Sequence, residues 1–193
     1  MTEPVAIAPD IEHVDETETP LARAHAAMAT LKAAGDTGAS WFYWIAVLSL
    51  VNTAITHSGG DHHFIVGLAI TFVVDVVANE IGKKTPELVT ILMVIAIGFS
   101  VFVSAMAGLF GWLSRKRVLW VFGVGMALYV LDGLIHLLVG DYLSAGFHGY
   151  VLFAMIRGFT SYRKLKRLED VIENASAVDT TVGHHTESAQ NMS

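Results

Sequence analysis

The sequence contains no cysteine among its 193 residues. Disulfide bonds, thiolate nucleophiles and cysteine-ligated metal sites are therefore excluded, and the redox compartment stays open. The chain also has no His-Glu-x-x-His pair, no Gly-x-Ser-x-Gly elbow and no phosphate-binding glycine loop. We therefore expect no cofactor, and nothing in the sequence indicates binding to nucleic acid.

Charged residues are scarce, at 16% of the chain compared with about 25% in soluble domains. The acids concentrate in residues 1–39, where seven of them accompany only Arg23 and Lys32. A hydrophobic share of 53% and a mean hydropathy of +0.54 indicate a chain that lies largely in lipid. The start, MTEPVAIAPD, has no basic segment followed by an apolar core. We therefore expect no cleavable signal peptide and a first span that directs membrane insertion.

An apolar stretch from residue 41 to residue 162 is interrupted by four short polar turns. A membrane-spanning helix needs about 20 residues, and about 17–25 are typical. The sequence predicts an all-α integral membrane bundle over 40–162, with five transmembrane helices at 41–56, 64–78, 88–113, 118–139 and 142–159. The second span is short and carries Asp75. Aromatic side chains that favour the headgroup level lie at the span ends, namely Trp41, Tyr43, Trp44, Trp112, Trp120, Tyr142 and Tyr162.

Polar tails flank this membrane domain. Residues 1–18 are predicted to be disordered. Thr19 and Pro20 predict a helix start and Gly35 its end, so 20–34 forms either a short amphipathic surface helix or a loosely helical linker. Residues 163–193 begin as a basic juxtamembrane helix and are expected to be disordered from about residue 175.

The distribution of Lys and Arg predicts the orientation, because these residues favour the cytoplasmic side. With five crossings, the loops at 57–63 and 114–117 and the C-terminal region share one face and hold eight basic residues. The N-terminal tail and the loops at 79–87 and 140–141 hold four. We therefore expect a cytoplasmic C-terminus and an N-terminus outside. The basic residues after Tyr162 could also contact anionic lipid headgroups, and these are Arg163, Lys164, Lys166 and Arg167.

Polar residues recur at helical spacing inside the predicted spans. The second span carries Gly67, Thr71, Asp75 and Asn79, the fourth carries Gly125, Tyr129, Asp132 and His136, and the fifth carries Ser144 and His148. Ionisable groups at membrane depth usually face the bundle interior. With five crossings, the end of the second span, the end of the fourth and the start of the fifth lie on the same side of the membrane. We therefore predict an intramembrane polar cluster in the outward leaflet, formed by Asp75, Tyr129, Asp132, His136 and His148.

Three readings of Asp132 and His136 remain open. They could form a structural pair that holds helices together, a proton or cation path, or a catalytic or metal site. A separate weak metal candidate is the loop sequence Asp61-His62-His63, near His57, although a solvated turn explains that loop better.

Small-x-x-x-small patterns let membrane helices approach closely, and we single out three on the predicted third and fifth spans. They are Ser104 with Gly108, Ala107 with Gly111, and Ala145 with Gly149. We expect them to serve internal packing first and a homo-oligomer seam second.

The stretches SWFYWIAVLSLVN, FIVGLAIT and ALYVLDGLIHLLVGDYLSAGFHGYVLF resemble a set of small uncharacterised bacterial multi-spanning inner-membrane proteins of about five helices. The resemblance covers about residues 40–160. It implies a bacterial inner-membrane location and a compact helical bundle, but it assigns no activity. In those proteins an aspartate like Asp132 recurs and the position of His136 is commonly apolar, which implies a structural role for Asp132.

The function expected from these observations is that of a non-enzymatic integral membrane protein whose buried acid–histidine cluster packs the helices. Its partner is the lipid bilayer, with anionic lipids and a second copy of the chain as candidates. The first alternative is a small homo-oligomeric transporter or channel coupled to protons or ions. The second is a metal-assisted intramembrane enzyme.

Overall fold

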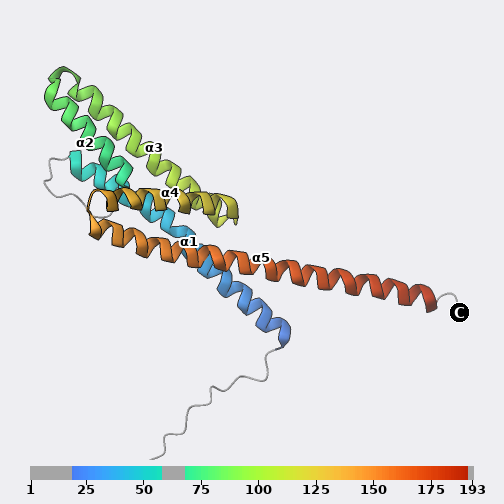
Figure 1. The fold of residues 1–193 in the computed structure, drawn as a ribbon. Helices are drawn as coiled ribbons and strands as arrows, with labels where there is room; N and C mark the ends of the chain where they lie inside the picture. The colour runs from blue at the N-terminus through green and yellow to red at the C-terminus, as the bar shows by residue number, and fades with distance from the viewer. Residues whose placement is uncertain (1–18, 58–67, 191–193) are drawn as a thin grey trace, which may run out of the picture.

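A computed structural model describes residues 19–57 and 68–190, with side chains described for 19–56 and 68–175. These residues form five α-helices and one short 3₁₀ turn, namely α1 Pro20–His57, α2 Ala69–Lys84, η1 Pro86–Leu88, α3 Val89–Arg115, α4 Leu119–Leu138 and α5 Tyr142–Gln190. The predicted all-α helical bundle is confirmed (Figure 1).

Within the residues that the structure describes, three segments are long and apolar enough to cross a membrane, namely α1, η1 with α3, and α4. Helix α2 has only 16 residues, fewer than the roughly 20 that a crossing needs. Helix α5 is long enough, but its apolar half also carries His148 and Arg157. Length and composition therefore single out three of the five predicted spans.

Helix α1 is continuous through residues that were expected to end a first short helix. Gly35 lies inside α1 and does not stop it, so that prediction was wrong. A side chain at Gly35 would overlap the ring of Tyr162 on α5. The glycine is therefore needed for close packing between helices, and this packing outweighs its cost of about 1 kcal/mol within a helix.

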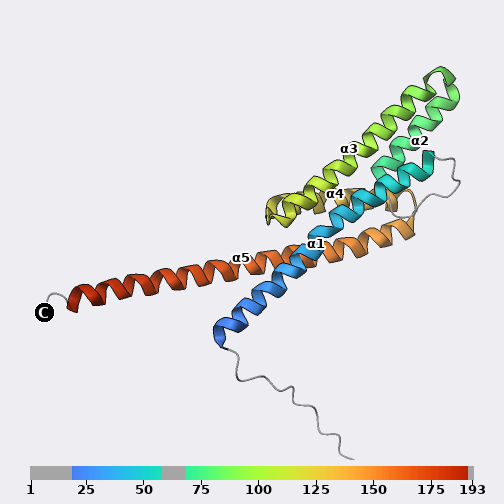
Figure 2. The same ribbon diagram turned by 180° about the vertical axis from the view of Figure 1, so that it is seen from behind.

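The four helices α1, α3, α4 and α5 alternate in direction. Gly111 near the end of α3 lies against Phe42 in the middle of α1. Phe122 at the start of α4 contacts Phe159 of α5, with ring centroids 5.7 Å apart. The start of α1 and the later part of α5 therefore lie at the same end of the bundle, which the view from behind also shows (Figure 2). Five crossings would have put the two termini at opposite ends.

Helix α2 begins inside the bundle. The backbone N–H of Leu68 donates to Oγ of Ser49, 3.3 Å away. Ser49 lies eight residues before the end of α1, which corresponds to about 12 Å along the helix. From there α2 packs along α3 as far as Gly82, whose Cα faces Val89. The α2–α3 pair leans away from α4 and α5 (Figure 1). The predicted second span at 64–78 thus differs from α2, which also includes 79–84, expected as a loop.

An aromatic core fills the end of the bundle nearer the termini. Phe42 and Phe122 pack edge to face, 5.5 Å apart, and Phe122 also contacts Tyr162. Phe122, Val151 and Met155 have no exposed surface. This core joins α1, α4 and α5 at that end of the bundle.

Helix α5 continues far beyond the bundle (Figures 1 and 2). It remains helical to Gln190, where a disordered tail had been expected from about residue 175. Near the bundle, Leu165 on α5 belongs to the buried core cluster, against which Met28 and Leu31 of α1 also pack. The predicted headgroup-binding residues are all exposed on this part of α5, namely Arg163, Lys164, Lys166 and Arg167.

Candidate functional site

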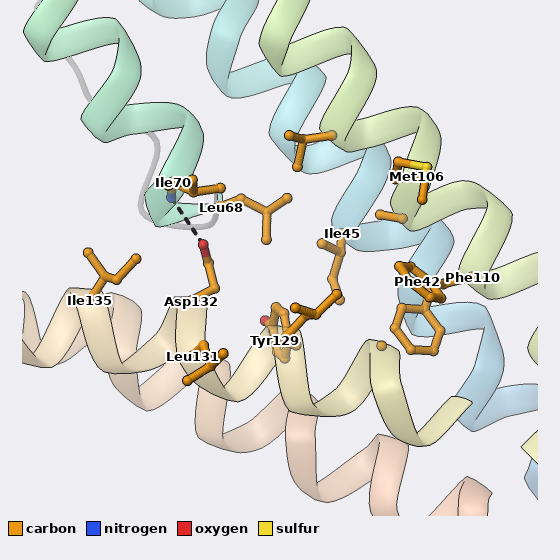
Figure 3. Close-up of a pocket in the computed structure, with 14 residues that line it drawn as sticks. Phe42, Ile45, Leu68, Ile70, Met106, Phe110, Tyr129, Leu131, Asp132 and Ile135 are labelled. Atoms are coloured by element: carbon orange, nitrogen blue, oxygen red, sulfur yellow. Dashed lines mark hydrogen bonds between the residues drawn. The ribbon is translucent and has the colours of Figure 1, made fainter. Parts of the chain in front are cut away.

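Asp132 of α4 caps the N-terminus of α2. Its Oδ2 accepts a hydrogen bond from the backbone N–H of Ala69 at 2.9 Å, and its Oδ1 accepts one from Ile70 at 3.0 Å. The bond to Ile70 is visible in Figure 3. The residue at the N-cap position is Leu68, whose side chain cannot accept a hydrogen bond. A carboxylate from another helix therefore takes the role usually played by a local Ser, Thr, Asp or Asn.

The energetic effect of this cap is large for a single side chain. A missing N-cap costs about 0.5–2 kcal/mol, and a negative charge at the positive end of a helix dipole adds up to about 2 kcal/mol when partly buried. The Asp132 side chain is only 6% exposed, so water offers it little competing solvation. Asp132 thus ties the start of α2 to α4 across 63 positions of sequence.

His148 of α5 completes the coordination of Asp132. Its Nε2 lies 3.0 Å from Oδ2 of Asp132, and its Nδ1 lies 2.8 Å from the carbonyl oxygen of Ser144. A carbonyl oxygen only accepts, so Nδ1 must carry a proton. One further proton is then shared between Nε2 and Oδ2. Asp132 also accepts the two N–H groups of α2, so its side chain links α2, α4 and α5 through hydrogen bonds.

Two neighbours hold the His148 ring in place. The ring of Tyr129 stacks on it with centroids 4.5 Å apart and planes inclined by 17°. Gly133 leaves the space that the ring occupies, because a Cβ there would lie 3.1 Å from Cβ of His148. The imidazole therefore has a fixed position between α4 and α5.

His136 lies one turn beyond Asp132 on α4. Its ring is 4.8 Å from that of His148, and its Nδ1 lies 3.3 Å from Oδ2 of Asp141 in the turn before α5. Hydrogen bonding from the side chain of Ser144, with help from the nearby His136, holds the pKa of Asp141 below its usual value. The other ring nitrogen of His136, Nε2, is buried and has no hydrogen-bond partner among the described residues.

Four of the five predicted cluster residues therefore come together, namely Tyr129, Asp132, His136 and His148. Asp75 does not join them. It lies six residues after Ala69, or about 9 Å further along α2. It is buried between α2 and α3, beside a second cavity that Thr56, Asn79 and Ala96 also line.

A cavity of about 310 Å³ lies on the other side of Asp132, between α1, α2, α3 and α4 (Figure 3). Its polar lining residues are Tyr129 and Asp132. The apolar ones include Ile45, Leu68 and Met106. Phe42 and Phe110, which belong to or pack against the aromatic core, also line the cavity. No polar passage through the described part of the bundle follows from this arrangement.

A second group of buried polar side chains had not been singled out from the sequence. Ser49, Asn52 and Thr53 on α1 and Ser100 and Ser104 on α3 are each at most 5% exposed. Their i, i+3, i+4 spacing on α1 and i, i+4 spacing on α3 could have revealed them. The weak metal candidate in the first loop, Asp61, His62 and His63, lies outside the described residues.

Among the small-residue pairs, only one glycine takes part in a close contact. A Cβ at Gly111 would meet Phe42 and Tyr43 of α1, whereas Gly108 and Gly149 face open space. Comparison with protein-family models, with curated proteins and with solved structures finds no match for this chain.

Proposed function

We propose that the chain is a multi-pass protein of the bacterial inner membrane with four crossings, α1, α3, α4 and α5, and one shorter helix, α2, that enters from one side only. The resemblance of residues 40–160 to small bacterial inner-membrane proteins supports the location. Four crossings put both termini on one side, with ten of the twelve Lys and Arg residues, while Lys83 and Lys84 lie at the other end. By the positive-inside rule both termini are cytoplasmic, which replaces the expectation of an exported N-terminus.

We propose further that the acid–histidine cluster is a non-enzymatic anchor that packs the helices. The observation that carries this proposal is the capping of Ala69 and Ile70 by Asp132. In lipid the first N–H groups of a helix have no water to bond, and each unsatisfied group costs several kcal/mol. Asp132 and His148 together make it favourable for α2 to begin within the membrane.

The alternative function, transport of a proton or ion, needs a path across the whole bundle. The fully buried Phe122, Val151 and Met155 lie where such a path would continue from Asp132 toward the termini. This apolar floor favours the anchoring role over transport.

The apolar cavity beside Asp132 favours a second candidate function, which is binding of one apolar molecule taken from the bilayer. Its volume of about 310 Å³ falls at the lower end of the range for ligand pockets, about 300–1,000 Å³. Replacing Ala107, which lines it, with Trp would fill the space. The control is Gly108→Trp, because a Cβ added there would meet nothing within 4 Å. This function is supported if Ala107→Trp loses binding of a fluorescent fatty acid while Gly108→Trp retains it. Equal binding by both variants would exclude it.

Substitution of Asp132 by Asn tests the anchoring role directly. The change keeps the shape of the side chain but replaces one acceptor oxygen with an NH2 donor, which must face either the N–H of Ile70 or the groups of Ala69 and His148. Leaving a buried hydrogen-bond donor unsatisfied costs about 1–3 kcal/mol. We expect faster amide hydrogen exchange at residues 69–72 and a lower melting temperature. The control variant Asp170→Asn, on the exposed face of α5, should show neither change.

Proteoliposomes separate anchoring from transport. The wild-type protein should give no proton or cation flux above that of empty liposomes when a gradient is applied. A flux that Asp132→Asn abolishes while the variant stays folded would refute the anchoring role and establish transport.

A further inference from the structure

Two histidines and one aspartate converge within the cluster. One ring nitrogen each of His136 and His148 and a carboxylate oxygen of Asp132 lie within 4.8 Å of one another. All three side chains are buried, with at most 7% of each residue exposed. Two imidazoles and one carboxylate form a donor set that suits divalent transition-metal ions such as Zn²⁺.

Each histidine is oriented by its outward nitrogen. Nδ1 of His148 donates to the carbonyl of Ser144 at 2.8 Å, and Nδ1 of His136 lies 3.3 Å from the carboxylate of Asp141. Histidines that ligate metals almost always make this kind of contact with the nitrogen that does not bind the ion. The anchoring of α2 explains the contact between His148 and Asp132 but does not explain why His136 is held in the same way.

The inner nitrogen of His136 is the independent observation. Its Nε2 is buried and has no partner among the described residues, although leaving a polar atom unsatisfied costs about 1–3 kcal/mol. Because Nδ1 faces Asp141, Nε2 lies on the opposite side of the ring, toward the interior. An ion coordinated there would satisfy this atom.

The distances also suit coordination. Nε2 of His148 and Oδ2 of Asp132 are 3.0 Å apart, and an ion bound between them would displace to solvent the proton that they share. Two ligands bound about 2.0–2.1 Å from one ion at a tetrahedral angle lie roughly 3.3 Å apart. The group lies within 4.8 Å as it stands, so His136 must approach the other two ligands to complete the coordination. Oδ1 of Asp132 would keep its bond to Ile70, so α2 would stay capped.

We propose that Asp132, His136 and His148 bind one divalent transition-metal ion of the Zn²⁺ class. Three protein ligands leave a coordination position for water or for a second ligand. The site shares Asp132 and His148 with the proposed anchor of α2, and His136 is the ligand that the anchor does not use.

Metal content of the full-length protein tests the proposal. The protein is purified in detergent without a polyhistidine tag, stripped with a chelator and dialysed against micromolar free Zn²⁺, and bound zinc is measured by mass spectrometry. We expect one tightly bound ion per chain, lost in His136→Ala and in His148→Gln. The matched control is His25→Ala, which removes an exposed histidine on α1 and should keep the ion. A double variant, His62→Ala with His63→Ala, should keep it as well.

A second readout keeps the test decisive if a variant folds poorly. A ligand that binds only the folded state raises the melting temperature, so Zn²⁺ should raise that of the wild type and of His25→Ala but not that of His136→Ala. His136→Ala leaves the contacts of Asp132 with Ala69, Ile70 and His148 in place, and its fold is checked by circular dichroism. The proposal is overturned if the wild type binds no zinc, or if His136→Ala retains the ion with unchanged affinity.

Discussion

Gly38 of α1 and Gly158 of α5 meet where the two helices cross, at a separation that only glycine permits. A Cβ added to either residue would lie 2.5 Å from the Cα of the other. One turn away, Gly35 of α1 leaves the space that the ring of Tyr162 on α5 occupies. Small residues at such crossings allow the backbone contact that drives association of helices in lipid. This crossing sets the position of the first and last helices of the bundle.

Substitution of Gly158 by Ala should therefore destabilise the protein. Elsewhere in a helix Gly→Ala is stabilising by about 0.5–1 kcal/mol. At position 158 the new methyl group meets backbone, and overpacking of this kind costs about 1–3 kcal/mol or more. Gly149→Ala on the same helix is the matched control, because a Cβ added there would have nothing within 4 Å. Thermal unfolding in detergent should show opposite signs for the two variants, and equal shifts would contradict the crossing.

Asp36 should give the protein a pH-dependent stability. It lies before the apolar part of α1, where Tyr162 donates to it at 2.6 Å and Lys32 pairs with it at 2.7 Å. Partial burial raises the pKa of Asp36, but hydrogen bonds from Lys32 and Tyr162 outweigh that effect and lower it overall. A lowered pKa contributes stability that is present above the ordinary value of about 3.9 and is lost as the pH falls through the folded value. Melting temperatures should therefore fall below about pH 4.

The variant Tyr162→Phe isolates this effect. It removes the hydroxyl group, so the pKa of Asp36 moves back toward its ordinary value and the acid-induced loss becomes smaller. The comparison of interest is the change in melting temperature between pH 6 and pH 3 in the two proteins. An equal change in wild type and Tyr162→Phe would mean that the Asp36–Tyr162 contact makes no contribution.

The helices that the sequence predicts well are those with strong local signals. Helices α3 and α4 begin and end within about two residues of the predicted spans, because long apolar runs stop at the charged turn around Lys116 and at Gly140. The position of Gly35 shows the limit of such signals. A glycine after a periodic segment normally indicates a helix end, but only the packing of Tyr162 reveals that this one lies inside α1.

The start of α2 could not be predicted because no local residue determines it. Leu68 and Ala69 have no capping side chains, and the cap comes from Asp132 on another helix. Because the contact with Asp132 fixes where α2 begins, Asp75 lies about 9 Å further along that helix, away from the histidines with which it had been grouped. Helical spacing correctly put Asp132, His136 and His148 on buried faces, since a period of 3.6 is a property of the sequence alone. The level at which α2 begins depends on tertiary structure.

Asp141→Asn should weaken zinc binding by about 10–100-fold if the proposed metal site exists, because it removes the carboxylate behind Nδ1 of His136. The side chain of Asp141 is 43% exposed, and an Asn can still accept the bond from the Ser144 N–H, so the fold should be retained. Zinc affinity is measured by competition with a chelating dye. Unchanged affinity in Asp141→Asn, beside a bound ion in the wild type, would show that His136 is not held for coordination.

The absence of cysteine makes the proposed topology directly measurable, since every introduced thiol is unique. His25→Cys on α1 and Lys166→Cys on α5 are exposed at the end of the bundle shared by the termini, and Lys84→Cys is exposed at the other end. In intact bacterial cells a membrane-impermeant maleimide should label only Lys84→Cys, and the other two should react after lysis. Five crossings would instead put His25→Cys and Lys166→Cys on opposite sides. If one of these two is labelled in intact cells and the other is protected, the chain has five crossings. In that case α2 crosses the membrane and does not enter from one side only.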